Sequence, residues 1–158
     1  MPQAASYSFL TAKAKIESYC AYQERAPEET RLKLHSWGLK ADDVEALISH
    51  LIAHNFLNEE RFAKAFAGGK FRIKKWGKVK IKIELKKRKI SDYCIRKGLA
   101  EIDEQEYDTA LRELIQKKLR ENKKGQQYQR NYKAAQYALS RGFESDLIWE
   151  ILKDLEKN

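Results

Sequence analysis

Residues 39–51 read LKADDVEALISHL, and the spacing of the apolar residues in this stretch decides the fold. Steps of five, four and three residues separate the key apolar positions, which are Leu39, Val44, Ile48 and Leu51. Steps of three and four residues bring side chains to one face of a helix, and Asp42 and Glu45 have the spacing of a capping box. The stretch therefore predicts a short helix with one buried stripe.

The same spacing occurs twice more along the chain, at offsets of 51 and 53 residues. The later copies are Ile90, Ile95, Leu99 and Ile102, and Phe143, Ile148, Leu152 and Leu155. The same offsets align Leu34, Leu85 and Ala138 in the preceding helix. Because internal repeats decide architecture before local propensity does, we predict three repeats, each with a long helix, a second helix and a short third one. Their predicted boundaries are 8–57, 58–102 and 103–158.

The composition favours an all-α protein. Of the 158 residues, 42% are hydrophobic and 35% are charged, and only two prolines and seven glycines interrupt the chain.

The apolar runs are too short to cross a bilayer, and the first residues lack the basic patch and apolar core of a secretory signal. Two cysteines, Cys20 and Cys94, do not indicate a disulfide framework. We therefore expect no membrane association and a reducing, cytoplasmic location.

Positive charge is concentrated in the middle of the chain. Residues 64–97, KAFAGGKFRIKKWGKVKIKIELKKRKISDYCIRK, contain fourteen lysines and arginines against two acidic residues, a local charge of +12. The whole chain carries +9, so the remainder sums to −3. A charge concentrated in this way attracts a polyanion or an acidic partner.

Within that stretch, residues 78–85, KVKIKIEL, alternate basic and apolar residues with the period of a strand. As a helix, the segment places Val79 and Ile83 nearly opposite Ile81 and Leu85, so both sides need apolar neighbours. A helix wedged between two repeats meets that demand. The repeat register favours the helix, and the strand is the alternative.

The lysines of the basic stretch have an unfavourable helical spacing. Lys74, Lys78 and Lys82 follow one another at four-residue intervals without acidic relief, as do Lys82 and Lys86. Like charges at this spacing repel, so a partner is expected to supply the negative charge. Trp76 either stacks on a base or fills a joint between helices, and the joint is the preferred interpretation.

The preceding helix is predicted to begin after an Asn58 cap, with Phe62, Phe66 and Ile73 on one side. Two adjacent glycines, Gly68 and Gly69, interrupt it, and we expect either a kink or a close approach by another backbone there.

Motifs of known enzymes are absent from the sequence. It has no glycine-rich phosphate loop, no serine elbow and no paired cysteines. His50 and His54 are four residues apart but have no third ligand nearby, so we interpret them as surface histidines on an amphipathic helix. The acidic pairs Asp42-Asp43 and Glu59-Glu60 are interpreted as helix-start acids. We expect no catalytic residue, no metal and no cofactor.

With the repeat and the basic stretch established, residues 14–155 resemble the RecX family of bacterial recombination regulators. The most specific match is FLNEERFA at residues 56–63, which is similar to the family signature aromatic-Leu-Asp-Asp-x-Arg-Phe-Ala. A second match begins at Trp76-Gly77 and continues through Ile81, Glu84-Leu85 and Ile90-Ser91; the third is Arg141-Gly142-Phe143 followed by Asp146-Leu147-Ile148. Asn58 replaces an aspartate of the signature, and Asn55 and Lys89 replace common glycines.

The resemblance implies an elongated, curved arrangement of three three-helix repeats and a non-enzymatic protein. Proteins of this family lie in the groove of the RecA filament on single-stranded DNA and limit its extension, ATP hydrolysis and strand exchange. The resemblance therefore implies a place in homologous recombination, DNA repair and the SOS response. By their match to the family motifs, Arg61, Lys78 and Glu84 are expected to be functional positions. Glu84 is interpreted as a structural partner for a neighbouring lysine and is given no binding role.

The leading hypothesis is a monomeric RecA modulator whose basic second repeat contacts the RecA filament or its single-stranded DNA. The alternatives are an autonomous, sequence-nonspecific nucleic-acid-binding helical protein, and a helical scaffold that binds an acidic protein. The predicted binding residues are Arg61, Arg72, Lys74, Lys75, Trp76, Lys78, Lys80, Lys82, Lys86, Lys87 and Arg88.

Overall fold

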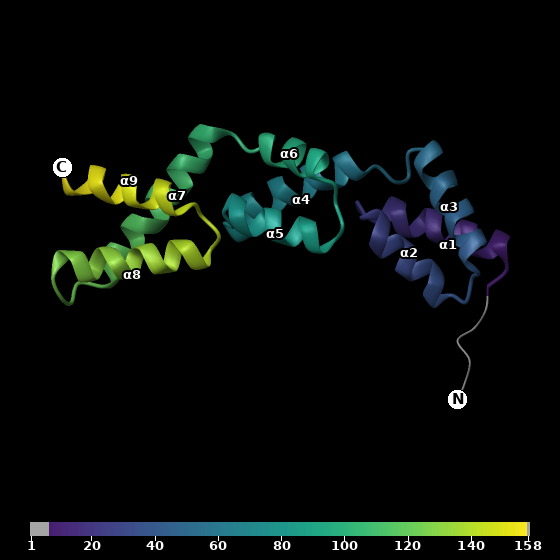
Figure 1. The fold of residues 1–158 in the computed structure, drawn as a ribbon, viewed down its shortest axis with the longest axis horizontal. Coiled ribbons are helices and arrows are strands. Elements are labelled where there is room, and N and C mark those ends of the chain that lie inside the picture. The colour runs from purple at the N-terminus through teal and green to yellow at the C-terminus, as the bar shows by residue number, and fades with distance from the viewer. Residues whose placement is uncertain (1–6, 158) are drawn as a thin grey trace, which may run out of the picture.

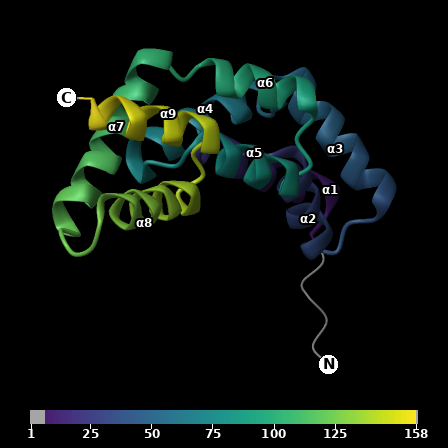
Figure 2. The same ribbon diagram turned by 60° about the vertical axis from the view of Figure 1, so that its left-hand side comes forward.

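The computed structural model describes residues 7–157, which form nine α-helices and no strand, so the predicted all-α class is confirmed (Figure 1). The helices are α1 Phe9–Tyr22, α2 Pro27–Ser36, α3 Ala41–Ala53, α4 Glu59–Lys74, α5 Lys78–Lys87, α6 Asp92–Ala100, α7 Glu104–Glu121, α8 Gln127–Ser140 and α9 Ser145–Glu156. Consecutive groups of three follow one another along the longest axis, with α1 to α3 at one end and α7 to α9 at the other (Figure 1). Figure 2 shows that the row follows an arc, as the resemblance implied.

Helices α1, α2 and α3 enclose the first core. Its fully buried side chains include Ile16, Leu34, Leu47 and Leu51, which come from all three helices. Pro27 begins α2, where its fixed backbone angle suits a first helical residue. The predicted capping box at Asp42 is wrong, because α3 begins two residues earlier than that box requires and Lys40 occupies its N-cap position.

Helices α4, α5 and α6 form the second group, in which α4 packs closely on α6. A Cβ atom at Gly98 would lie 2.7 Å from the carbonyl oxygen of Ala63, so only glycine allows the two helices to approach this far. Across α4 lie Ile81 and Leu85 of α5, both with no exposed surface. These contacts orient α5 and determine which of its side chains face outward.

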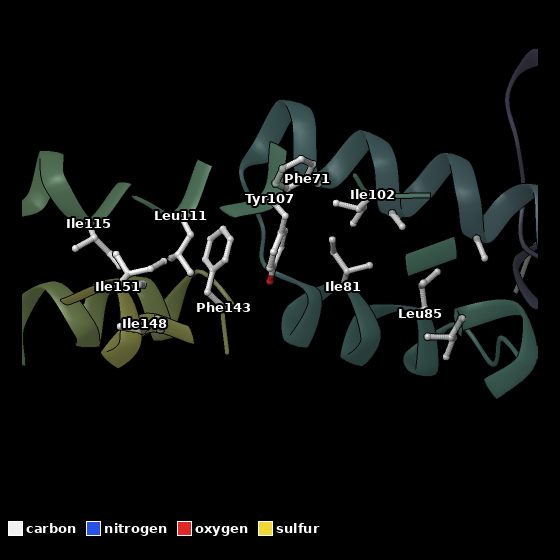
Figure 3. Close-up of a cluster of buried hydrophobic side chains, with 14 of the residues drawn as sticks. Phe71, Ile81, Leu85, Ile102, Tyr107, Leu111, Ile115, Phe143, Ile148 and Ile151 are labelled. Carbon is white, nitrogen blue, oxygen red and sulfur yellow. The ribbon is translucent and has the colours of Figure 1, made fainter. Parts of the chain in front are cut away.

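The third group, α7 to α9, shares a continuous hydrophobic core with the second. Figure 3 shows Tyr107 and Phe143 side by side between Phe71 of α4 and the Leu111 and Ile115 side chains of α7. The ring centre of Tyr107 lies 5.5 Å from that of Phe71 and 5.2 Å from that of Phe143. The second and third groups are therefore joined by aromatic packing as well as by the chain.

The segment KVKIKIEL is helical, as the repeat register predicted, and it forms most of α5. The expectation that this helix is wedged between apolar neighbours on both sides is wrong. Ile81 and Leu85 are buried, but Val79 and Ile83 are 44% and 50% exposed. One face of α5 thus presents aliphatic side chains to solvent.

Two expectations for α4 are also corrected. Ile73 does not join Phe62 and Phe66 on a buried face, because it is 79% exposed near the helix end. The helix runs without a break through Gly68 and Gly69. The nearest neighbours of a Cβ atom at Gly68 would be atoms of the Arg72 side chain, and a Cβ atom at Gly69 would have nothing within 4 Å, so the expected close backbone is not what either glycine would meet first.

The turn between the second and third helices has the same left-handed backbone in every repeat. The φ angles of Gly38, Lys89 and Gly142 are 83°, 59° and 94°. Asn55, which replaces a common glycine of the family, also has a left-handed backbone, with a φ of 63°. Lys89 therefore occupies a position where the other two repeats use glycine.

Within residues 7–157, the helices are all too short or too polar to cross a membrane.

Candidate functional site

Helix α5 presents a mixed basic and aliphatic surface, which we call the α5 face. Helical geometry places five exposed side chains together on it. These are Val79, Lys82, Ile83, Lys86 and Lys87. Lys78, Lys80 and Arg88 are half-buried and lie outside this face, over the rings of Tyr107, Trp76 and Phe66 respectively.

The first turn of α5 is held by the third repeat. The amide N–H groups of Gly77 and Val79 donate to the carbonyl oxygens of Arg141 and Gly142, at 2.8 and 2.9 Å. The Lys78 amide donates to the hydroxyl of Tyr107 at 2.9 Å. The first amides of a helix have no partner within it, so the α8–α9 turn and Tyr107 serve as the N-terminal cap of α5.

Two glycines make that capping possible, because the two backbones almost touch. A Cβ atom at Gly77 would lie 2.3 Å from the carbonyl group of Gly142, and one at Gly142 would lie 2.2 Å from the Cβ atom of Lys80. The Arg141 guanidinium completes the contact by donating to the Lys74 carbonyl oxygen. The motifs Trp76-Gly77 and Arg141-Gly142-Phe143, far apart in sequence, are thus the two halves of one joint.

Tyr107 sits at the centre of this joint. Its hydroxyl donates to a carboxylate oxygen of Glu144, and burial together with this hydrogen bond raises the pKa of Tyr107 far above its ordinary range. The ammonium group of Lys78 lies 4.7 Å from the centre of the same ring. Both the backbone amide and the side chain of Lys78 therefore contact Tyr107 in the joint.

Trp76 is part of the same joint and packs against the core. Its ring centre lies 6.3 Å from that of Phe66, and the ammonium groups of Lys70 and Lys80 lie 4.9 and 4.5 Å from its centre. These contacts support the interpretation of Trp76 as a joint residue. They also account for the half-burial of Lys80.

Glu84 is a structural partner for its neighbours, as expected. Arg88 approaches its carboxylate to 3.1 Å and Lys87 to 3.3 Å, and hydrogen bonds from Arg88 and then Lys87 lower the pKa of Glu84. Lys86 lies 3.9 Å from Asp92. Among the residues that the structure describes, Lys82 has no acidic side chain within ion-pair distance.

Of the lysine pairs predicted to repel at four-residue spacing, only those within α5 lie on one helix. Lys75 has a left-handed backbone with a φ of 56°, which ends α4, so Lys74 and Lys78 belong to different helices. The predicted repulsion therefore holds for Lys78, Lys82 and Lys86 but not for the pair Lys74 and Lys78.

The structure does not gather all the predicted binding residues in one place. Lys74 and Lys75 line a groove of about 310 Å³ with Lys117 and Arg141 of the third repeat. Arg72 lines a different groove, which also contains acidic residues of α7. Of the predicted binding residues, only Lys82, Lys86 and Lys87 lie on the α5 face.

Arg61 also lies apart from the α5 face, at the junction of the first and second repeats. Its guanidinium binds the Glu24 carboxylate at 2.6 Å and the Asn55 carbonyl oxygen at 3.0 Å, and Glu24 raises the pKa of Arg61. These contacts tie the α1–α2 connection to the start of α4. The arginine of the FLNEERFA motif thus has a structural partner.

Sequence reasoning missed the exposed aliphatic residues of this region and the residues that fix α5. It predicts that Val79 and Ile83 are buried, although the strand-like alternation already shows that α5 has two apolar sides. It gives no role to Tyr107 or Glu144. The roles of these two residues depend on contacts between repeats that no local pattern reveals.

Comparison with known proteins places this architecture in a family. Residues 58–99 match the model described as RecX, second three-helix domain, and residues 104–152 match RecX, third three-helix domain. The chain belongs to the RecX family. A regulatory protein RecX from Clostridium acetobutylicum is 30% identical over 152 residues, covering 94% of this chain and 70% of that protein.

Other RecX relatives differ in length. The regulatory protein RecX of Prosthecochloris aestuarii is 30% identical, and the match covers 89% of this chain and 90% of that protein. For a relative from Clostridium perfringens strain 13, 31% identical, the match covers 63% of the protein. The crystal structure of RecX from Lactobacillus salivarius matches 95% of this chain and 97% of its own with a TM-score of 0.87 at 22% identity.

The relatives are named as regulatory proteins. In the described part of the chain, no three His, Cys, Asp or Glu side chains come together as a metal site would require. His50 instead lies 2.8 Å from the Glu17 carboxylate. The α5 face is the candidate site.

Proposed function

We propose that this chain is a non-enzymatic regulator of RecA, which acts as a monomer in the cytoplasm. It binds the RecA filament on single-stranded DNA through the α5 face and limits ATP hydrolysis, filament extension and strand exchange. Membership of the RecX family supports the partner, and the α5 face supports the mode of binding. The observation that carries the proposal is a rigidly capped helix with lysines and aliphatic residues on one exposed side.

The charge of the α5 face favours an anionic partner. Lys82 and Lys86 are one turn apart, and Lys87 follows at the edge. Their mutual repulsion is relieved when phosphates or acidic side chains approach. Because the N-terminus of α5 is fixed by three hydrogen bonds to the third repeat, these lysines are presented in one orientation.

The aliphatic residues favour a protein surface within that partner. Val79 and Ile83 lie between the lysines and are about half exposed. Phosphate binding alone gives no role to such side chains, whereas a protein interface gains from covering them. A filament of protein on DNA offers both kinds of surface.

The test is inhibition of RecA-driven ATP hydrolysis by a variant with Lys82→Glu and Lys86→Glu. We expect inhibition to be lost while the helical circular dichroism is unchanged, because both side chains are exposed. The matched control is Lys33→Glu with Lys40→Glu, which changes the net charge equally on exposed positions of the first repeat. Full inhibition by the α5 variant would reject this surface as the binding site.

A second candidate function is autonomous, sequence-nonspecific nucleic-acid binding, which the unpaired Lys82 favours. A second variant, Val79→Ser with Ile83→Ser, separates the two. For a RecA regulator, co-sedimentation with the RecA filament weakens by at least about tenfold, because apolar surface is no longer buried, while binding to naked single-stranded DNA is unchanged. An autonomous DNA-binding protein binds naked DNA with a steep salt dependence and leaves RecA activity unaltered.

A further inference from the structure

A second, chemically different surface lies on the third repeat, in the groove between α8 and α9. The groove has a volume of about 1090 Å³. Three aromatic side chains line it and face solvent: Tyr128, Tyr132 and Trp149 are 66%, 58% and 41% exposed. Large aromatic residues are normally covered, so this grouping points to a ligand with flat surfaces.

The floor of the groove is a hydrogen-bonded network of polar side chains. Asn131 is only 6% exposed, and its amide donates to Glu156 at 2.5 Å and accepts from Gln127 at 2.9 Å. This network ties the start of α8 to the end of α9. The aromatic residues are therefore carried by helices with a fixed spacing.

The rim of the groove is basic. Lys124, Lys133 and Lys153 line it, and the carboxylate of its single acidic residue, Glu156, is already bound by Asn131. Residues 117–133 contain seven basic residues and one acidic residue. The net charge of the third repeat does not reveal this local positive charge, because acidic residues at the start of α7 offset it.

Aromatic faces, ammonium groups and neutral amides match the parts of a single-stranded nucleic acid. Bases stack on aromatic side chains without regard to sequence, and lysines neutralise the phosphates. The side-chain oxygen of Gln129 accepts from the Gln126 backbone amide at the start of α8, which leaves the NH2 group of Gln129 to donate to base edges. We propose that the α8–α9 groove binds unstacked bases of single-stranded DNA. The inference rests on the proposed function, in which that DNA is the core of the bound filament.

This chemistry differs from that of the α5 face. The α5 face combines lysines with aliphatic side chains and suits a protein surface with phosphates nearby. The α8–α9 groove combines lysines with aromatic side chains and suits exposed bases. The two surfaces lie on different repeats, so the chain has separate contacts for the recombinase and for its DNA.

The experiment uses the full chain and short labelled oligonucleotides, without RecA. Fluorescence anisotropy compares oligothymidylate with an abasic strand of equal length, which has the phosphates but no bases. We expect the wild-type chain to bind oligothymidylate more tightly. Tyr128→Ala with Tyr132→Ala should weaken that binding by at least about fivefold and leave binding to the abasic strand unchanged.

Two control variants accompany the measurement. Tyr22→Ala removes an exposed tyrosine from the first repeat and should have no effect. Tyr128→Phe with Tyr132→Phe keeps the rings and should retain binding. Because Tyr128 and Tyr132 are more than half exposed, circular dichroism of the alanine variant should match that of the wild type.

Equal binding of the wild type to the two strands, or undiminished binding of oligothymidylate by the alanine variant, would overturn the proposal. A change confined to self-association in sedimentation velocity would identify an interface between copies and would also overturn it. The proposed function is judged separately. Its test uses the α5 variants and RecA activity, so either result can fail while the other stands.

Discussion

Replacement of Gly77 by alanine tests whether the third repeat sets the orientation of α5. The new Cβ atom would lie 2.3 Å from the carbonyl carbon and oxygen of Gly142 and 2.4 Å from the Phe143 nitrogen. All three are backbone atoms, so no side-chain rotation relieves the overlap. The α8–α9 turn must move away from the first turn of α5.

That movement breaks the cap. Three hydrogen bonds link the repeats there, from the amides of Gly77, Lys78 and Val79. Each contributes about 0.5–1.5 kcal/mol, and a donor left without a partner costs about as much again. We therefore expect Gly77→Ala to lower the free energy of unfolding by about 2–4 kcal/mol.

Urea denaturation followed by circular dichroism measures the change, and the chain supplies a matched control. Gly69 lies inside α4, where an added Cβ atom would have nothing within 4 Å, so Gly69→Ala should stabilise the chain by about 0.4–1 kcal/mol. The same substitution thus has opposite signs at the two glycines. A Gly77→Ala chain as stable as the wild type would refute the account of the joint.

Three further predictions concern the turns, the cores and pH. Lys89→Gly should stabilise the chain by about 1 kcal/mol in the same assay, because glycine adopts the left-handed backbone without strain; an unchanged midpoint would contradict this. A fragment of residues 58–158 should melt cooperatively, and residues 103–158 alone should not, because the second and third repeats share one core; this also tests the repeat boundaries we propose. Burial raises the pKa of the Cys20 thiol from 9.0 to about 11. The thiol therefore ionises first in the unfolded chain, and the free energy of unfolding should fall by about 2 kcal/mol between pH 9 and pH 11; Cys20→Ala should remove this loss.

The repeat could be predicted because its signal is the burial of apolar side chains at fixed spacing. Val44, Ile95 and Ile148 occupy matching positions and are each at most 2% exposed. A side chain at such a position must pack against the preceding helices whatever lies beyond the repeat. Helix type and order then follow from short-range geometry.

The exposure of one face of α5 could not be predicted from the sequence, because it depends on no other helix covering that face. Two apolar sides on one helix indicate two covered faces, and only the placement of the third repeat shows that one is left open. That repeat contacts the N-terminal end of α5 through Gly142 and Tyr107 and leaves Val79 and Ile83 exposed. The site thus arises from contacts between residues about thirty to sixty-five positions apart in sequence.

Strained lysines flank α5, so the stability of the chain is connected to the positive charge around this helix. Lys75 and Lys89 have left-handed backbones, a conformation that costs an ordinary residue about 1 kcal/mol or more relative to glycine. At the position of Lys89 the other two repeats have Gly38 and Gly142, so glycine, which has less backbone strain, is compatible with the same turn. Both lysines are exposed and add to the positive charge around α5. If that charge serves binding, Lys89→Gly makes the chain more stable and a weaker inhibitor of RecA, whereas a stabilised variant with full inhibition would show that Lys89 is only a poor turn residue.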